Sequence, residues 1–257
     1  MIDKKHSAFP VIAALLFFSC NADAIVSMEG LHTSKPEEGF SGNVELSASN
    51  SSGNTEKEEY SLGTRLQWQH GAMTDFLLLS ADYSKNGDIK TSDNGFIHLR
   101  HIQQFHQVVA WEAYLQAEKD QFARLEYRGL AGGGLRFSLY EEENLGAVYL
   151  GLGAYYSEER IDKSYADAGT ETLWRGNSYL LLKYQLNPDA AVMSTTYYQP
   201  ASGNPDDYRL LEQAALKVKL TDLLSLVVSY DLRFDSDPPL GVEKRDSTFK
   251  TSLSVDF

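Results

Sequence analysis

The chain has 257 residues and a formal net charge of −13, and its mean hydropathy is negative. The acidic balance argues against nucleic acid as a partner. Beyond the N-terminus no apolar run reaches the roughly 18 residues of a membrane-spanning helix, but a transmembrane barrel stays open as a fold because only alternate residues of its strands face lipid.

Residues 1–24 have the pattern of a secretory signal peptide. Lys4-Lys5 gives a basic start, 11–18 is a short apolar core, and Ala22-Asp23-Ala24 offers a small-x-small cleavage site. We expect export and cleavage after Ala24 by signal peptidase I, which removes Cys20, the one cysteine of the chain. The alternative is lipoprotein processing at Cys20. An exported chain without a mature cysteine needs no disulfide framework.

Residues 25–39 lack periodicity and contain Pro36, so we expect a short periplasmic lead-in. From Phe40 to Phe257 the chain alternates apolar and polar residues in segments separated by turn residues, the pattern of β-strands. Twelve strands are predicted, at 41–51, 58–70, 73–84, 95–105, 108–118, 123–140, 144–158, 172–186, 190–199, 207–220, 223–235 and 246–257.

The lengths of the predicted connections depend on their parity. Even connections, such as 70–72 and 187–189, are short, whereas most odd ones, such as 85–94 and 159–171, are longer. Outer-membrane barrels have short periplasmic turns and long external loops, and a soluble sandwich has no reason to sort its loops in this way. The chain is also rich in aromatics, which the girdles at the two membrane interfaces would use. We therefore predict an all-β, transmembrane, antiparallel up-and-down barrel over residues 40–257, in the outer membrane of a Gram-negative bacterium.

Several short motifs occur in a fixed order along the chain. They are Ser52-Gly53-Asn54-Thr55, Trp68, Tyr127-Arg128 with Gly132-Gly133-Gly134, and Asp235-Ser236-Asp237-Pro238-Pro239. Together they resemble the YdiY-like family of unknown function, whose members are described as salt-induced outer-membrane proteins. The resemblance runs from about Phe40 to Phe257. It implies a barrel and a location, and it supplies no reaction and no catalytic residues.

The last strand, 246–257, places Phe249, Leu253, Val255 and the terminal Phe257 on one face. Such an ending resembles the C-terminal signal of outer-membrane barrels. We expect these four residues to act as an assembly signal that the barrel-assembly machinery binds as an unpaired edge. Outer-membrane lipid and lipopolysaccharide are the other expected partners, and the protein is expected to be a monomer.

The alternation also turns charged residues toward the lumen. Both signs occur, with a basic excess among the candidate lumen-lining residues Arg124, Arg128, Arg136, Lys183, Lys217 and Lys219. One interpretation is a plug of paired charges that fills a narrow lumen, since buried charges are tolerable when paired. The other is a water-filled pore that favours anionic solutes or acidic saccharides. Acidic residues assigned to the external loops, Glu159 among them, leave a surface receptor or adhesin as a third possibility.

No motif of the chain predicts a reaction, a cofactor or a metal. The glycines of 129–153 are not followed by a helix, so they do not form a phosphate-binding loop, and we interpret them as bends that close the barrel. His98 and His101 lie three apart on a strand and should face opposite sides. We therefore expect a non-enzymatic barrel with a structural or small-solute role linked to envelope or salt stress.

Overall fold

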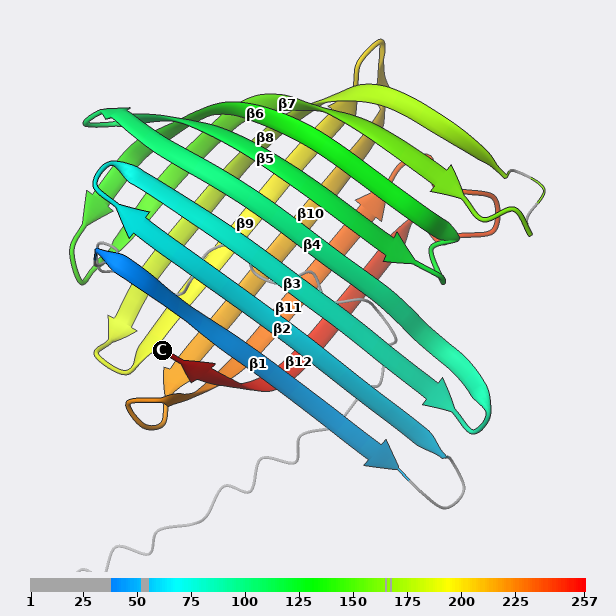
Figure 1. Cartoon of the computed structure of the whole chain (residues 1–257), viewed down its shortest axis with the longest axis horizontal. Helices are drawn as coiled ribbons and strands as arrows, with labels where there is room; N and C mark the ends of the chain where they lie inside the picture. Colours follow the sequence, from blue (N-terminus) through cyan, green and yellow to red (C-terminus); the bar gives the residue numbers. More distant parts are fainter. Residues whose placement is uncertain (1–37, 52–55, 165, 167) are drawn as a thin grey trace, which may run out of the picture.

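The computed structural model describes residues 38–51, 56–164, 166 and 168–257, so the predicted signal peptide, the lead-in up to residue 37 and the motif at 52–55 lie outside the described residues. The described chain forms one antiparallel closed barrel of twelve strands (Figure 1). Each strand pairs with its neighbours in sequence and β1 pairs with β12, which confirms the predicted up-and-down barrel. The strands are β1 Gly39–Ser51, β2 Lys57–His70, β3 Met73–Asn86, β4 Ile89–His106, β5 Val109–Asp120, β6 Leu125–Glu142, β7 Gly146–Ile161, β8 Gly169–Asn187, β9 Ala190–Ala201, β10 Asn204–Lys219, β11 Leu224–Asp235 and β12 Arg245–Asp256.

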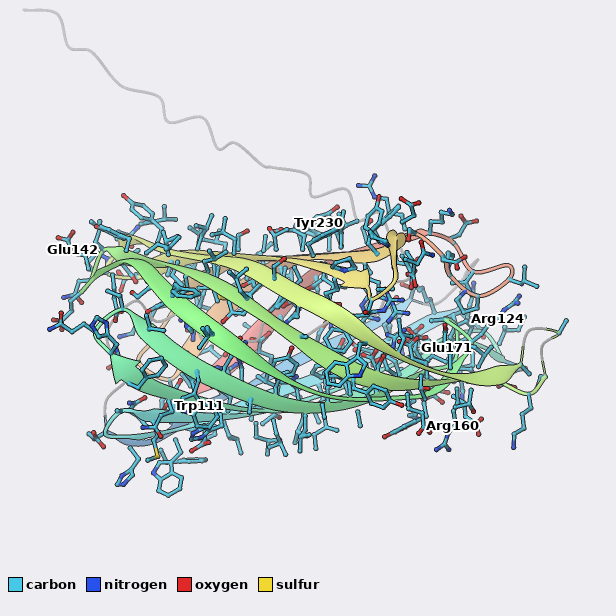
Figure 2. The ribbon with its side chains drawn as sticks, turned by 90° about the horizontal axis from the view of Figure 1, so that it is seen from above. Trp111, Arg124, Glu142, Arg160, Glu171 and Tyr230 are labelled. Carbon is cyan, nitrogen blue, oxygen red and sulfur yellow. The ribbon has the colours of Figure 1, made fainter. Side chains whose placement is uncertain are left out.

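Alternation along each strand gives the barrel an apolar outside and a polar inside. In β11, Ser225 and Asp231 are buried toward the lumen. On each strand, the residues that alternate with the inward ones face outward. Many of them are leucines or aromatics, and Trp111, Leu180 and Phe249 are examples that are exposed on the outer wall. Figure 2 shows Trp111 and Tyr230 pointing outward from opposite walls. An apolar outer face at every second residue is what a strand in contact with lipid requires.

The start of β1 and the end of β12 lie at the same end of the barrel, which we call the termini end. The opposite end is the loop end. At the termini end the backbone N–H groups of Gly42 and Phe257 donate to each other's carbonyl oxygens, at 2.7 and 2.9 Å. In Figure 2, Glu142 lies at the termini end, whereas Arg124, Arg160 and Glu171 lie at the loop end. Within the ranges that the structure describes, we find no helix of sufficient length and apolarity to cross a membrane.

Two predicted external loops are shorter than expected. The connections predicted at 85–94 and 200–206 are turns of two residues, Gly87–Asp88 and Ser202–Gly203, because the flanking strands continue to the turn. Glycine at each turn takes a positive φ, 57° at Gly87 and 88° at Gly203, which a side chain would disfavour. The loop between β11 and β12 remains long, at 236–244.

A β-bulge changes the facing at the start of β6. The pairing shifts between Leu125 and Tyr127, so Leu125 is buried inside and Glu126 is exposed, the reverse of what strict alternation with Arg128 and Arg136 inside would give. The extra residue of a bulge reverses the alternation locally. From Arg128 to Phe137 the strand alternates as predicted, and Arg136 is buried in the lumen; a second shift of the pairing follows between Ser138 and Tyr140.

The barrel is flattened. Figure 1 looks down its shortest axis, and Figure 2 shows the thinner profile. The glycines of β6 and β7 make room for tyrosine rings in this narrow interior. A Cβ atom on Gly151 would collide with the ring of Tyr179, and one on Gly132 would lie within 2.7 Å of Tyr114. These glycines therefore admit large inward side chains, in addition to the bending expected of them.

We expect Gly151→Ala to destabilise the barrel because the added methyl group displaces the Tyr179 ring. Overpacking of this kind costs about 1–3 kcal/mol. The measurement is the urea concentration at which the unboiled, compact form is lost on a gel. Gly176→Ala is the matched control, since a Cβ atom there lies at ordinary contact distance, 3.4 Å from Pro200. Equal midpoints for the two variants would contradict the packing role.

Candidate functional site

The middle of the lumen is crossed by a cluster that we call the central belt: Arg100, Glu112, Arg136, Tyr149 and Tyr179. Arg100 of β4 lies 2.5 Å from the Glu112 carboxylate of β5, and both side chains are almost fully buried. Arg100 also donates to the Tyr179 hydroxyl of β8 at 2.7 Å, and this hydroxyl donates to Glu112 at 2.8 Å. The Arg136 guanidinium lies 3.8 Å from the centre of the Tyr149 ring. The belt is thus a closed polar network.

The network joins strands that are not neighbours in the sheet. β4 and β8 are four strands apart, yet Arg100 reaches Tyr179. Next to this contact, Asn177 of β8 donates to the Tyr114 hydroxyl of β5 at 2.9 Å. Tyr179 and the inward-facing Leu78 are 2% and 0% exposed, so water does not reach them from either end of the barrel. Side chains of the belt and its neighbours therefore meet across the lumen.

Between the belt and the loop end lies a cavity of about 550 Å³, which we call the vestibule. It extends from Arg100 and Tyr114 up to Pro238 in the loop between β11 and β12. Its lining includes five arginines or lysines and six aspartates or glutamates. The two signs are therefore nearly balanced, and the vestibule has no basic excess.

Five of the eleven charged residues of the vestibule form one network around Glu159 of β7. Arg209 of β10 approaches both oxygens of this carboxylate, at 2.6 and 2.9 Å. Arg128 of β6 donates to Glu159 at 3.0 Å and to Glu118 on its other side. Arg209 also donates to Asp235 at 2.8 Å. Glu159 was predicted in an external loop, and this assignment is wrong because β7 continues to Ile161 and turns Glu159 into the lumen.

The six candidate basic residues lie in three different places. Arg128 and Arg136 line the lumen, in the vestibule network and the belt respectively. Arg124 lies in the turn before β6, with φ of 58°, and its guanidinium donates to the Leu240 carbonyl at the loop end. The three lysines lie toward the termini end, on β8 and β10: Lys183, Lys217 and Lys219. The structure does not bring the six together into one ladder.

Two of these lysines have carboxylate partners. Lys217 lies 2.5 Å from Asp256. Lys219 lies 2.8 Å from Asp222 in the exposed turn between β10 and β11. The hydrogen bond from Lys219 holds the pKa of the Asp222 carboxyl below its usual range. These contacts are local and do not form part of the belt.

The four residues of the predicted assembly signal, Phe249, Leu253, Val255 and Phe257, are exposed on the outer wall of the barrel. The Phe257 ring lies 6.4 Å from that of Phe40, so the last residue also covers the junction of β12 with β1.

The strand alternation alone did not single out Tyr179, Arg209 or Glu159. Tyr179 alternates with the outward Leu180, which is the signal that could have placed it inside. His98 is buried in the lumen and His101 pairs with Asp75 on the outer face, which confirms that the two histidines face opposite sides. Among the described residues, no three His, Cys, Asp or Glu side chains are grouped so that they could hold a metal ion.

The closed twelve-strand barrel is the architecture of outer-membrane β-barrel proteins. The chain belongs to the family "Protein of unknown function, DUF481", whose model matches residues 44–257. This match confirms the family resemblance inferred from the motifs. No curated protein matches the chain.

Three solved structures illustrate the likeness of the fold. The NanC porin has 11% sequence identity and a TM-score of 0.52, with 84% of this chain and 100% of that chain covered. The KdgM porin has 10% identity and a TM-score of 0.44, with 85% and 99% covered. The translocator domain of the autotransporter NalP from Neisseria meningitidis has 11% identity and a TM-score of 0.46, with 88% and 90% covered. At these identities only the fold is shared. Of these three structures, only the NanC porin has a TM-score above 0.5, so the comparison of the fold rests on it.

We expect Glu159→Gln to destabilise the barrel, because it removes the negative charge between Arg128 and Arg209 in a buried site. Loss of one partner from a buried ion pair costs about 3–5 kcal/mol. Urea midpoints of the purified protein in detergent measure the change. Asp222→Asn is the control, since its exposed pair with Lys219 contributes about 0–1 kcal/mol. A Glu159→Gln midpoint equal to that of the control would contradict the network.

Proposed function

We propose that this protein is an integral outer-membrane β-barrel of a Gram-negative bacterium, exported with a cleaved signal peptide. The fold and the apolar outer face support this location. The termini end is then periplasmic and the loop end external, as in barrels with an even number of strands. In this role the protein acts as a component of the envelope and catalyses no reaction.

The observation that carries the functional proposal is the central belt. Side chains from opposite walls meet there and are buried, which supports a lumen that is closed at that height in the resting barrel. We therefore propose a structural, envelope-stabilising role, in which the resting barrel passes no solutes. A link to salt stress is part of the proposal and rests on the resemblance of the sequence motifs to the YdiY-like family.

A selective channel for anionic solutes is the less favoured alternative. It requires an excess of basic groups along an open path. The vestibule instead has six carboxylates and five basic groups. Arg128 contacts two glutamates, and Lys217 contacts Asp256. Anion preference is therefore not expected from these residues.

The vestibule supports a second candidate function, the binding of a small ligand from outside the cell. Its cavity of about 550 Å³ lies at the loop end and is lined by aromatic and apolar residues, such as Phe96, Phe122 and Phe234, together with the ion-pair network. Concave sites with apolar walls and a few polar groups are typical of small-molecule binding. A surface receptor, the third possibility from the sequence, would therefore bind its ligand in the vestibule.

Planar-bilayer recording tests the closed lumen. We expect the wild-type protein to insert without steady openings. The double variant Glu112→Ala/Tyr179→Ala should show them, because it removes the two groups that hold Arg100 across the lumen. Lys219→Ser/Asp222→Ser, which changes an exposed pair outside the belt, is the control and should stay closed. Steady, anion-selective openings of the wild type would overturn the proposal in favour of the channel.

Deletion of Phe257 tests the assembly signal. We expect the deletion to lower the amount of barrel recovered in the outer-membrane fraction more than it lowers the urea midpoint of the barrels that do form. The reason is that an unpaired terminal strand offers an edge for recognition before β1 covers it. Phe40→Ala, which removes the ring opposite Phe257, is the control for packing alone. Equal losses of yield and stability would show that Phe257 only packs.

A further inference from the structure

The junction between β1 and β12, which we call the seam, is paired over a short length. Four residue pairs join the strands, from Asn43 with Asp256 to Leu46 with Leu253, and the mutual bonds of Gly42 and Phe257 add one more row. By comparison, thirteen pairs join β1 to β2 and eleven join β11 to β12. Figure 1 shows β1 and β12 diverging toward the loop end.

The unpaired part of the seam falls within the thickness of a membrane. Five paired rows at about 3.3 Å per residue, tilted by about 45°, span roughly 12 Å, or about half of the roughly 25 Å apolar band of such barrels. Residues 47–51 of β1 and 245–252 of β12 lie beyond these rows. Backbone groups left unpaired in hydrocarbon are strongly unfavourable, so this half of the seam must meet a polar partner.

The side chains at the two edges are suited to such a partner. On β1 the outward positions of the unpaired part, Ala48 and Asn50, are small or polar and exposed. On β12 the small Thr251 alternates there with the exposed, apolar Phe249. On the adjacent strand β2, Tyr60 and Leu62 take the outward positions and provide an apolar surface. The apolar band is therefore interrupted on the β1 side of the seam, beyond Leu46.

Behind the opening, an ion pair connects the two sides of the barrel. Lys250 of β12 lies 2.8 Å from Asp82 of β3, across the positions of β1 and β2. Three buried side-chain oxygens on the inner faces of the same two strands have no hydrogen-bond partner among the described residues: Asp82 Oδ2, Ser80 Oγ and Thr248 Oγ1. Buried polar atoms of this kind normally find a partner.

A groove on the outer wall begins at the edge of β1. Its volume is about 730 Å³, and its lining includes Leu46, Leu62, Ala81 and Gly95 across β1 to β4. Small residues at Ala81 and Gly95 form its floor, and Lys119 lies at its far end, 3.1 Å from Asp93. A lipid-facing groove of this shape accommodates an acyl chain.

We propose that the loop half of the seam is a lateral opening that holds the phosphorylated sugar headgroup of a lipopolysaccharide molecule, with an acyl chain in the adjoining groove. Phosphate would bind near the exposed Arg245 at the loop end of β12, and the Lys250–Asp82 pair would lie deeper in the opening. The external leaflet at the loop end supplies this lipid. The inference rests on the proposed function, because it requires the barrel to lie in the outer membrane with the loop end outside.

Engineered disulfides test the opening, in the full chain with Cys20→Ser as background. Glu45→Cys/Ser254→Cys lies in the paired part, and Ser51→Cys/Thr248→Cys occupies the position that the same register would reach beyond it. Gly42 and Phe257 form a hydrogen-bonded pair, and such pairs alternate along the strands with pairs that are not hydrogen-bonded. In an ideal ladder both cysteine pairs would be of the second kind, so their geometries would match. We expect the second pair to oxidise at least about tenfold more slowly, since separated strands hold the two sulfur atoms apart. Equal rates would overturn the opening.

Cysteine labelling tests the occupant. Thr251→Cys in vesicles of phosphatidylcholine should react with a water-soluble maleimide, and vesicles containing lipopolysaccharide should protect it severalfold. Leu253→Cys, on the same face of β12 but in the paired part, is the control and should react equally in both. Equal labelling of Thr251→Cys in both vesicles would overturn the lipid occupant, as would protection by phosphatidylethanolamine of equal size. A disulfide-linked dimer of Thr251→Cys would assign the opening to a second copy of the chain.

These results stay distinct from a failure of the proposed function. The Glu45→Cys/Ser254→Cys disulfide and the compact unboiled form report whether the barrel is folded in the membrane. If both are present and the Ser51→Cys/Thr248→Cys pair oxidises at the same rate, the barrel stands and the opening is refuted. If both are absent, the barrel in the membrane is itself refuted.

Discussion

The structure depends on one constraint: a flattened barrel of twelve strands must fill its own interior. Opposite walls lie close enough for side chains to meet, so inward positions cannot be occupied by charges that rely on water. Arg100, Glu112 and Tyr179 satisfy one another in the central belt. Glycine at Gly151 provides the space for the Tyr179 ring. Pairing across the lumen follows from this geometry, since an unpaired charge in such a site is unfavourable.

The belt divides the barrel into regions with different properties. Toward the loop end, the Glu159 network holds Arg128 and Arg209 at the wall and leaves a vestibule between them and the outer rim. Toward the termini end, the lumen holds an apolar cluster of Met193, Ala215 and Val227 beside the Lys217–Asp256 pair. The outer wall is mainly apolar, with polar positions on the β1 side of the seam and at Glu212 of β10, which accepts from Ser194 and Thr196. A barrel organised in this way can close the lumen to solutes and still present a binding surface outside.

Much of the fold could be predicted from the sequence because alternation is local. Each strand indicates its own faces, so the twelve strands and their order follow from the pattern and the turns. The central belt could not be predicted, since the meeting of β4 with β8 depends on barrel flattening and strand stagger, which no single strand encodes. Local exceptions also escape the pattern. The bulge at Leu125 reverses the facing, and the continuation of β7 brings Glu159 inside when the sequence suggested a loop.

The central claim is that the belt closes the lumen at mid-height, and one-sided thiol modification tests it most directly. Leu130→Cys lies in the vestibule and Ala215→Cys lies beyond the belt. Each single variant, in a Cys20→Ser background, would be exposed to a membrane-impermeant thiol reagent added at the loop end of reconstituted barrels. The account predicts rapid modification of Leu130→Cys and protection of Ala215→Cys. Modification of both at similar rates would contradict a closed lumen.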